Sequence, residues 1–543
     1  MTKLMDWAPG SIIRWLFDSE QGDSQRLIPR WIFLRALGLI YFSAFYSLVF
    51  QIRGLTGPNG ILPASEFLET LSRFGPTRFW IAPTLLWLSS SSHMLMALCW
   101  VGMLASLLLT FNLWPRGMLL ICFLCFLSFV TAAQDFSGYQ SDGMLLEAGF
   151  ISLFFAPPGL RPRLAGSHPP SRASQFLLLW ECFRIYFESG VVKLASGDPQ
   201  WRNFTAMDEY YQNGPLPTWI GWYVQHLPHR IHAFATGATL VMELGLVWMF
   251  FLPRPVRIAC FFIVTPWQAM VILTANYTFL NYLVLALGFL LLDDRFIRRV
   301  LPPRWSGRLE TQLSVPEPAP NQNLETSTAL PAPLPRPSHF PALRLALVSV
   351  VLIWILYATT VQMVMIVFPF PFPTSPVAVL EPFRIANRFG LFAVMTRGRW
   401  EIEFQGSNDG QNWTAYPFRY KPQDPSKGPG IYAPYQPRFD WNLWFASLGT
   451  WRDNMFVVSA EERLLSDDKD VLALFAGNPF ANAPPKLVRA VIWQYWFTSI
   501  PEKRATGMWW TRRLLGLYAP TVEKLPDGKL GVVQWPEALP PRQ

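Results

Sequence analysis

Four charged residues lie within one apolar stretch that is long enough to cross a bilayer, residues 175–195. Glu181, Arg184 and Glu188 are spaced i, i+3 and i+7, so they share one face of a helix. Charges are costly inside a membrane, so this face indicates either a self-neutralising cluster that packs a helix bundle or a functional polar site. Lys193 lies about 140° around the helix from Glu188, on another face or at the helix end.

Two acidic residues flank the start of another apolar stretch, residues 143–155. Asp142 closes the preceding polar turn and Glu147 lies inside the stretch. With Lys193 on the same side of the membrane, these side chains are expected to meet at the mouth of the bundle; otherwise they cap helices and orient loops. The predicted intrabundle polar cluster comprises Glu181, Arg184, Glu188, Lys193, Asp142 and Glu147.

Other residue types with chemical potential occur in unsuitable settings. Cys122 and Cys125 form C-x-x-C, but they lie in an apolar span with no basic neighbour to lower a thiol pKa, so core packing is favoured over redox chemistry. Histidines recur at positions 226, 229 and 232, but Pro228 interrupts any helix through them. We predict no catalytic residue, no metal site and no cofactor.

The composition is typical of a membrane protein. Hydrophobic residues make up 51% of the chain and charged residues only 15%, against about 25% charged in an ordinary globular protein. The formal charge of +9 comes from arginines beside apolar spans, with no stripe of basic and aromatic residues. The lipid bilayer is therefore an expected partner and nucleic acid is not.

The apolar runs predict a cytoplasmic N-terminal segment (1–30), a transmembrane bundle of about eight spans (31–300) and a final span (342–368). Pro266 is expected to interrupt the seventh span. Lys and Arg are concentrated in alternate loops, which indicates that the C-terminal region is not cytoplasmic. The predicted spans are 31–50, 93–113, 117–133, 143–155, 175–195, 232–252, 256–275, 277–292 and 342–368.

The C-terminal region has the pattern of a soluble domain. A Pro-rich linker (301–341) precedes the last span, a β-rich domain is expected over 377–520, and a tail over 521–543. Residues 399–421 predict two strands joined by a turn, residues 487–499 predict another strand, and Ser459 to Glu462 resembles a capping box at a helix start. The predicted fold is a multi-pass α-helical membrane bundle with a C-terminal α+β, β-rich soluble domain.

An aromatic run in this domain suggests two roles. Trp441, Trp444 and Phe445 recur at helical spacing beside Arg438 and Asp440. Three aromatics at this spacing form a burying face, which favours the domain's own core. If the face is exposed, it is a candidate surface for binding client proteins.

Several long blocks resemble the lipase maturation factor family. They are RALGLIYFSAFYSLVFQIRGLTGPNGILPA (35–64), FSGYQSDGMLLEAGF (136–150), residues 188–228, PFRIANRFGLFAVMTRGRWEIEFQGSNDGQNWTAYPFRYKP and APYQPRFDWNLWFASL within 382–448, and NPF (478–480). The resemblance implies assistance in the folding and assembly of secreted lipases, with client contacts mapping to about 377–500. It implies the endoplasmic reticulum membrane in a eukaryotic cell, or the inner membrane in a bacterium, and assigns no catalytic residue.

A membrane enzyme is the alternative hypothesis. The polar residues of the fourth and fifth spans loosely resemble those of multi-span vitamin K-dependent carboxylase-like proteins. An enzyme of that type requires Lys193, Glu188 and Asp142 in one pocket at the non-cytoplasmic end of the bundle, whereas a maturation factor does not.

Overall fold

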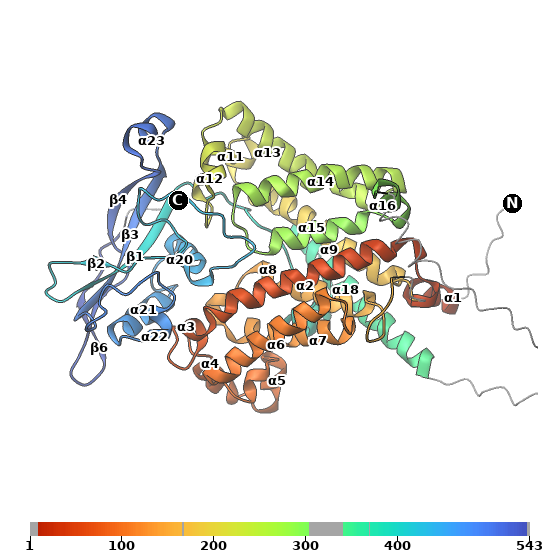
Figure 1. Ribbon diagram of the computed structural model, residues 1–543, viewed down its shortest axis with the longest axis horizontal. Helices are drawn as coiled ribbons and strands as arrows, with labels where there is room; N and C mark the ends of the chain where they lie inside the picture. The colour runs from red at the N-terminus through yellow and green to blue at the C-terminus, as the bar shows by residue number, and fades with distance from the viewer. Residues whose placement is uncertain (1–8, 165–167, 303–339, 369, 540–543) are drawn as a thin grey trace, which may run out of the picture.

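The computed structural model describes residues 9–164, 168–302, 340–368 and 370–539. These residues form a helical bundle that continues into a β-sheet with its own helices, and the two parts lie along the longest axis of the molecule (Figure 1). Most of the linker predicted over 301–341 lies outside the described residues. The predicted fold class, a multi-pass helical bundle with a β-rich domain, is confirmed.

Each predicted span corresponds to a helix of the bundle. Six of the described segments are long and apolar enough to cross a membrane: Ser24–Val49, Ser92–Thr110, Pro115–Ala132, His229–Phe251, Arg254–Thr274 and Ala342–Val367. The remaining predicted spans are the shorter α8 (Gln140–Phe155) and α15 (Leu280–Gly288) and the more polar α9 (Arg172–Ala195). The main bundle helices are α2 (Leu27–Val49), α6 (Ser92–Thr110), α7 (Pro115–Ala132), α13 (His229–Leu244), α14 (Arg254–Thr274) and α18 (Phe340–Val367).

The expected interruption at Pro266 is wrong, because α14 continues through this proline as one helix. Proline removes one backbone donor, but neighbouring groups can compensate for it within a membrane helix. A break occurs one helix earlier, where α13 ends at Leu244 and a 3₁₀ helix covers Leu246–Phe251.

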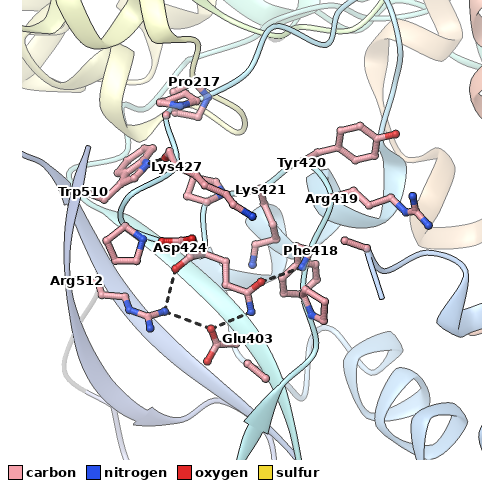
Figure 2. A pocket seen from close by; sticks show the side chains of 18 of the residues that line it. Pro217, Glu403, Phe418, Arg419, Tyr420, Lys421, Asp424, Lys427, Trp510 and Arg512 are labelled. Carbon is pink, nitrogen blue, oxygen red and sulfur yellow. Dashed lines mark hydrogen bonds and ion pairs between the residues drawn. The ribbon is translucent and has the colours of Figure 1, made fainter. Parts of the chain in front are cut away.

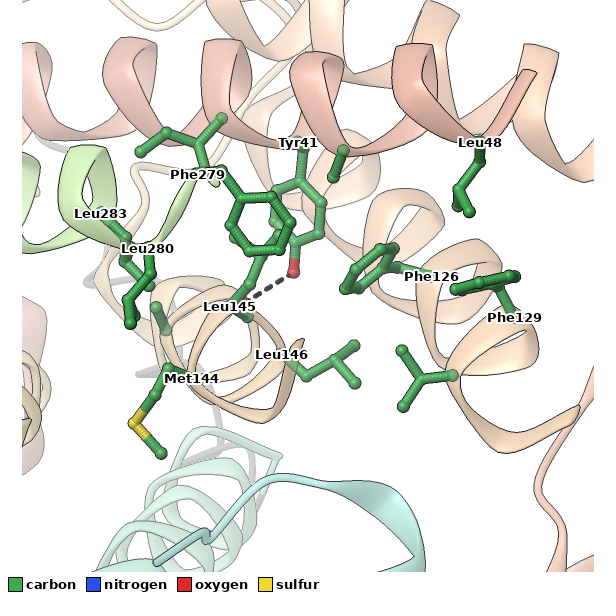
Figure 3. Packing of buried hydrophobic residues seen from close by; sticks show 14 of the residues in the cluster. Tyr41, Leu48, Phe126, Phe129, Met144, Leu145, Leu146, Phe279, Leu280 and Leu283 are labelled. Carbon is green, nitrogen blue, oxygen red and sulfur yellow. Dashed lines mark hydrogen bonds between the residues drawn. The ribbon is translucent and has the colours of Figure 1, made fainter. Parts of the chain in front are cut away.

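Helix α2 lies in the core of the bundle and packs closely against α6 and α8. Tyr41 is fully buried and its hydroxyl donates a 3.0 Å hydrogen bond to the carbonyl oxygen of Leu145 on α8 (Figure 3). Phe126 of α7 meets the Tyr41 ring edge-on at 6.0 Å. A Cβ on Gly149 would lie 2.0 Å from the Tyr41 hydroxyl oxygen, so a larger residue there would separate the two helices.

The C-terminal sheet is antiparallel and is built around one long strand, β3 (Leu487–Phe497). β3 pairs with β1 (Arg399–Ser407) along its length, with Ile402 opposite Ile492. Its other edge pairs with β4 (Trp510–Leu517) and β5 (Thr521–Lys524). The short β2 (Thr414–Ala415) follows β1, as the predicted hairpin required, and β6 (Leu530–Gln534) follows β5.

Two sequence-based boundaries in this domain need correction. Residues 521–534, assigned to a tail, supply β5 and β6, because these short strands are stabilised by pairing, β5 with β3 and β6 with β5. The capping box at Ser459 is wrong: α21 (Phe456–Leu465) has already begun, and Ser459 donates to the carbonyl of Met455 instead. A capping box is present at Ser499 and Glu502, where α23 (Ile500–Thr506) begins.

Candidate functional site

A stretch without regular secondary structure links the last membrane helix to the sheet. After α18, the chain forms α19 (Ser375–Leu380) and a 3₁₀ turn (Glu381–Phe383). Residues 384–398, here called the inserted segment, then run beside the sheet-facing ends of α8 and α9 before β1 begins. Backbone of this kind has no internal hydrogen-bond partners, so where it is buried the surrounding helices must supply them.

The charged residues of α8 and α9 supply those partners. The Asn387 amide donates to Glu147 Oε2 at 2.9 Å, and the Phe389 amide donates to Glu188 Oε2 at 2.6 Å. Arg184 donates through Nη1 to the Asn387 carbonyl oxygen at 2.7 Å. Arg184 also pairs with Glu147 and lies 3.8 Å from Glu188, and all three charged side chains are buried. The cluster therefore holds a buried, non-helical chain in place.

The inserted segment contacts α9 at residues well before the C-terminal end of that helix. At a rise of 1.5 Å per residue, Glu188 lies about 10 Å and Arg184 about 16 Å from the helix end at Ala195. Farther along, the Phe392 carbonyl accepts from Trp201 Nε1 at 2.9 Å, and the Met395 amide donates to Asp198 Oδ2 at 2.6 Å. The inserted segment thus runs from the interior of the bundle towards the sheet.

Glu181 is not compensated by Arg184 as the spacing suggested. Its side chain is fully buried, and neither carboxylate oxygen has a hydrogen-bond partner among the described residues. The Arg184 guanidinium is instead directed to Glu147 of α8 and to the Asn387 carbonyl. Arg184 therefore has one acceptor on α8 and one on the inserted segment, and it makes no hydrogen bond to Glu181 on its own helix.

Lys193 and Asp142 have separate partners. Lys193 Nζ lies 2.8 Å from both carboxylate oxygens of Glu243 on α13 and 5.1 Å from the centre of the Trp201 ring. Asp142 pairs with Arg438. Lys193, Glu188 and Asp142 therefore belong to different pairs, and none of them lines any of the cavities described in this structure. The single pocket that the enzyme hypothesis requires is not formed by these three residues.

The Asp142–Arg438 pair joins the bundle to the sheet domain. Arg438 Nη1 and Nη2 donate to the two Asp142 oxygens at 2.7 and 2.8 Å, and both side chains are fully buried. The guanidinium lies over the Phe129 ring at 4.7 Å, and the Arg438 amide donates to Gln51 Oε1 at 2.7 Å. A bidentate pair of this kind fixes orientation as well as distance.

Asn276 makes a further polar contact across the junction. Its Oδ1 accepts from the amides of Tyr432 and Ala433 at 2.7 and 3.1 Å, and its Nδ2 donates to the Gly430 carbonyl at 3.0 Å. Asn276 is buried, and its side-chain amide is fully engaged in these structural hydrogen bonds. Arg399, at the start of β1, donates to the Pro215 carbonyl at 3.0 Å. The two parts of the chain are therefore joined by several buried polar contacts.

Four of the five client-binding candidates are buried. Arg438, Asp440, Trp441 and Trp444 are at most 8% exposed, whereas Phe445 is 45% exposed. Trp441 packs against Tyr139 of the bundle, with ring centres 5.8 Å apart. Asp440 Oδ1 accepts the amides of Tyr420 and Lys421, and burial raises the pKa of the Asp440 carboxyl to about 6. These four residues form the core and the junction in this conformation, and Phe445 is accessible.

A cavity of about 520 Å³ lies beside the sheet. It is enclosed by β1, β4 and the Pro-rich loop at 417–429, with Pro217 of the bundle at its rim (Figure 2). Trp510 and Phe418 supply apolar walls, and Arg512 donates to Glu403 at 3.3 Å beneath them. The prolines are visible in the sequence, but their convergence over the sheet is not.

The most important residues that sequence reasoning missed are Asn387, Phe389, Gln51 and Asn276. Phe389 acts through its backbone amide, which no side-chain pattern reveals. Asn387 uses its backbone amide and carbonyl, and its side-chain Nδ2 also donates to the Gly143 carbonyl and to Glu147 Oε2. Their one signal was an aperiodic run, PFRIANRFG, between the last span and the first strand. Gln51 and Asn276 are single polar residues beside predicted span ends, and no spacing pattern links either of them to the sheet domain.

Comparisons with known proteins cover both parts of the chain. The family model for the lipase maturation factor transmembrane domain matches residues 28–299, and the model for the lipase maturation factor C-terminal domain matches residues 385–520, beginning within the inserted segment. No solved structure matches this chain.

Similar proteins align over nearly the full length. Lipase maturation factor 2 of Gallus gallus is 32% identical over 91% of this chain and 81% of its own. Lipase maturation factor 2 of Homo sapiens is 31% identical over 91% and 82%, and lipase maturation factor 1 of Bos taurus is 30% identical over 94% and 92%. The bundle, the sheet and the segment that joins them are therefore those of a member of the lipase maturation factor family.

Proposed function

We propose that this protein is a non-enzymatic membrane maturation factor that assists the folding and assembly of secreted lipases. Family membership supports a role in lipase maturation. The observation that carries the proposal is the use made of the intramembrane charges. Glu147, Arg184 and Glu188 hold the inserted segment, and Asp142 holds Arg438. These residues serve to mount the sheet domain on the bundle, which favours a scaffold over the enzyme alternative.

The sheet domain is proposed to face the non-cytoplasmic side, where secreted proteins fold. The distribution of Lys and Arg supports this orientation. The corresponding membrane is that of the endoplasmic reticulum in a eukaryotic cell, or the inner membrane in a bacterium. An unfolded client would then meet a domain that is held at a fixed height above the bilayer.

Client contact is proposed to involve the exposed Phe445, while Arg438, Asp440, Trp441 and Trp444 support the domain from inside. The Phe445 ring meets the ring of the buried Trp444 edge-on, with ring centres 5.0 Å apart, which restricts its orientation. An exposed aromatic on a rigid base suits the transient capture of apolar segments.

The functional test is co-expression with a secreted lipase in cells that lack a maturation factor. The expected result is more lipase activity per unit of secreted lipase mass, with an unrelated secreted protein unaffected. Photo-crosslinkers placed at position 445 should capture the nascent lipase, whereas one at the buried position 444 serves as the matched control. Unchanged specific activity of the lipase would contradict the proposed function, and rescue without crosslinking at 445 would contradict only the client surface.

A further inference from the structure

A second cavity, of about 220 Å³, lies where the ends of several membrane helices meet the chain before the sheet. Its walls come from the end of α7, the start of α8, the last turns of α18 and residues 381–388. It is separate from the cavity on the sheet, and it shares only Asn387 with the contacts of the charged cluster.

The cavity has two arginines at its mouth. Arg384 and Arg388 are exposed, and within the described residues neither guanidinium has an ion-paired or hydrogen-bonded partner. Glu381 also lines the cavity, but it does not lie within ion-pair distance of either arginine. The Gln362 side-chain oxygen is buried there without a hydrogen-bond partner. The cavity thus offers two guanidinium groups and one carboxylate that are not engaged in hydrogen bonds or ion pairs within the described residues, and one unsatisfied amide oxygen. Arg384 and Arg388 act on Asp142 and Glu188 of the bundle only through longer-range electrostatics.

Neighbouring aromatic residues place this cavity at the level of a membrane surface. Trp80 is 47% exposed and meets Phe383, the residue before Arg384, with ring centres 4.9 Å apart. Phe79 beside it is also exposed. Tryptophan side chains such as that of Trp80, projecting from a membrane protein, are typical of the headgroup region.

The length of α18 agrees with that placement. From Arg344 near its start to Val367 at its end, α18 rises about 35 Å, close to the thickness of a bilayer's hydrocarbon core. Its exposed residues in between are apolar, among them Leu347, Val350 and Ile353. A lipid tail can therefore lie along α18 while its headgroup reaches the cavity at the top.

We propose that this cavity binds the headgroup of a phospholipid from the leaflet on the sheet side. Arg384 and Arg388 would hold the phosphate, and Glu381, which lines the same cavity, would pair with a cationic amine on the headgroup. Guanidinium groups match phosphate oxygens in geometry and charge, and remain charged at any physiological pH. A phosphate group is the chemistry recognised, and the apolar surface of α18 makes a lipid rather than free phosphate the ligand.

Native mass spectrometry of the detergent-purified full chain tests this proposal. The probes are palmitoyl-oleoyl phosphatidylethanolamine, the diacylglycerol with the same tails, and inorganic phosphate. The test variant carries Arg384→Gln and Arg388→Gln. The control carries Arg452→Gln and Arg504→Gln, two exposed arginines of the sheet domain. Melting curves without added lipid check that all three proteins are folded.

The expected result is a phosphatidylethanolamine adduct in the parent and the control, and about tenfold less in the test variant, as loss of roughly 1.4 kcal/mol of binding would give. Diacylglycerol should bind the parent at least about tenfold more weakly on the same scale. If the test variant does not fold, this headgroup preference of the parent decides the question. Equal binding of the two lipids by the parent, equal adducts in a folded test variant, or full displacement by inorganic phosphate at the lipid's concentration would overturn the proposal.

Discussion

Replacing Arg438 with leucine removes the bidentate partner of Asp142 at the junction of bundle and sheet. Asp142 is fully buried, and the Phe136 carbonyl also loses its 2.8 Å hydrogen bond from Arg438. Removing one member of a buried ion pair costs about 3–5 kcal/mol, chiefly because the other charge is left without a partner. The cost should appear as opening of the junction, since the pair joins α20 (Arg438–Leu448) to α8.

Hydrogen exchange measured by mass spectrometry on the peptide 430–440 reports this opening directly. The amides of Tyr432 and Arg438 donate across the junction to Asn276 and Gln51. A loss of about 3–5 kcal/mol predicts exchange from these amides that is faster by roughly 10² to 10³-fold or more, because each 1.4 kcal/mol is a factor of ten in the open population.

Two further variants separate the causes. Leucine at both Arg438 and Asp142 removes both charges, so it should recover most of the protection. Arg452→Leu, at an exposed arginine of the same domain, should leave exchange unchanged. If Arg438→Leu exchanges like the parent, the pair does not hold the junction. If the double variant exchanges as fast as the single variant, lost packing and not an unpaired charge is responsible, and the electrostatic reasoning is refuted.

Three other predictions address the core, the pH response and the orientation. Trp444→Ala should cost about 3–5 kcal/mol by emptying a buried site, whereas Phe445→Ala should change the melting temperature little; equal effects would contradict the assigned burial. The pKa of the Asp440 carboxyl is raised to about 6 in the folded state, so the folded protein binds this proton more tightly than the unfolded chain does. The stability of the protein should therefore fall by at most about 3 kcal/mol as the pH rises from about 4 to 6. A series of melting curves against pH should show this loss in the parent and not in Asp440→Asn. A cysteine at position 412, exposed beside β2, should react with a membrane-impermeant thiol reagent in intact bacterial cells or in opened microsomes; protection in both would reverse the proposed orientation.

Local features of the sequence were sufficient to predict most of the membrane helices and the longest strands. Apolar runs such as 342–368 predict membrane helices because the bilayer requires a continuous hydrophobic length, whatever the neighbours are. The alternating residues of 487–499 predict β3 for a similar reason, since strand periodicity is a property of the strand itself. Pro266 misled because its effect depends on whether surrounding groups compensate for the lost donor, and β5 and β6 were missed because short strands gain their stability from pairing.

The partners of the charged residues were decided by the tertiary structure. Helical spacing predicted that Arg184 compensates Glu181, but Arg184 pairs with Glu147 of α8 and donates to the Asn387 carbonyl. The spacing of Trp441 and Trp444 indicated burial but not that Trp441 packs against the bundle. A sequence shows that a buried charge needs a partner, because desolvation is costly everywhere in the interior. Which partner it finds depends on contacts between residues far apart in the chain, and these exist only once the bundle, the inserted segment and the sheet have packed together.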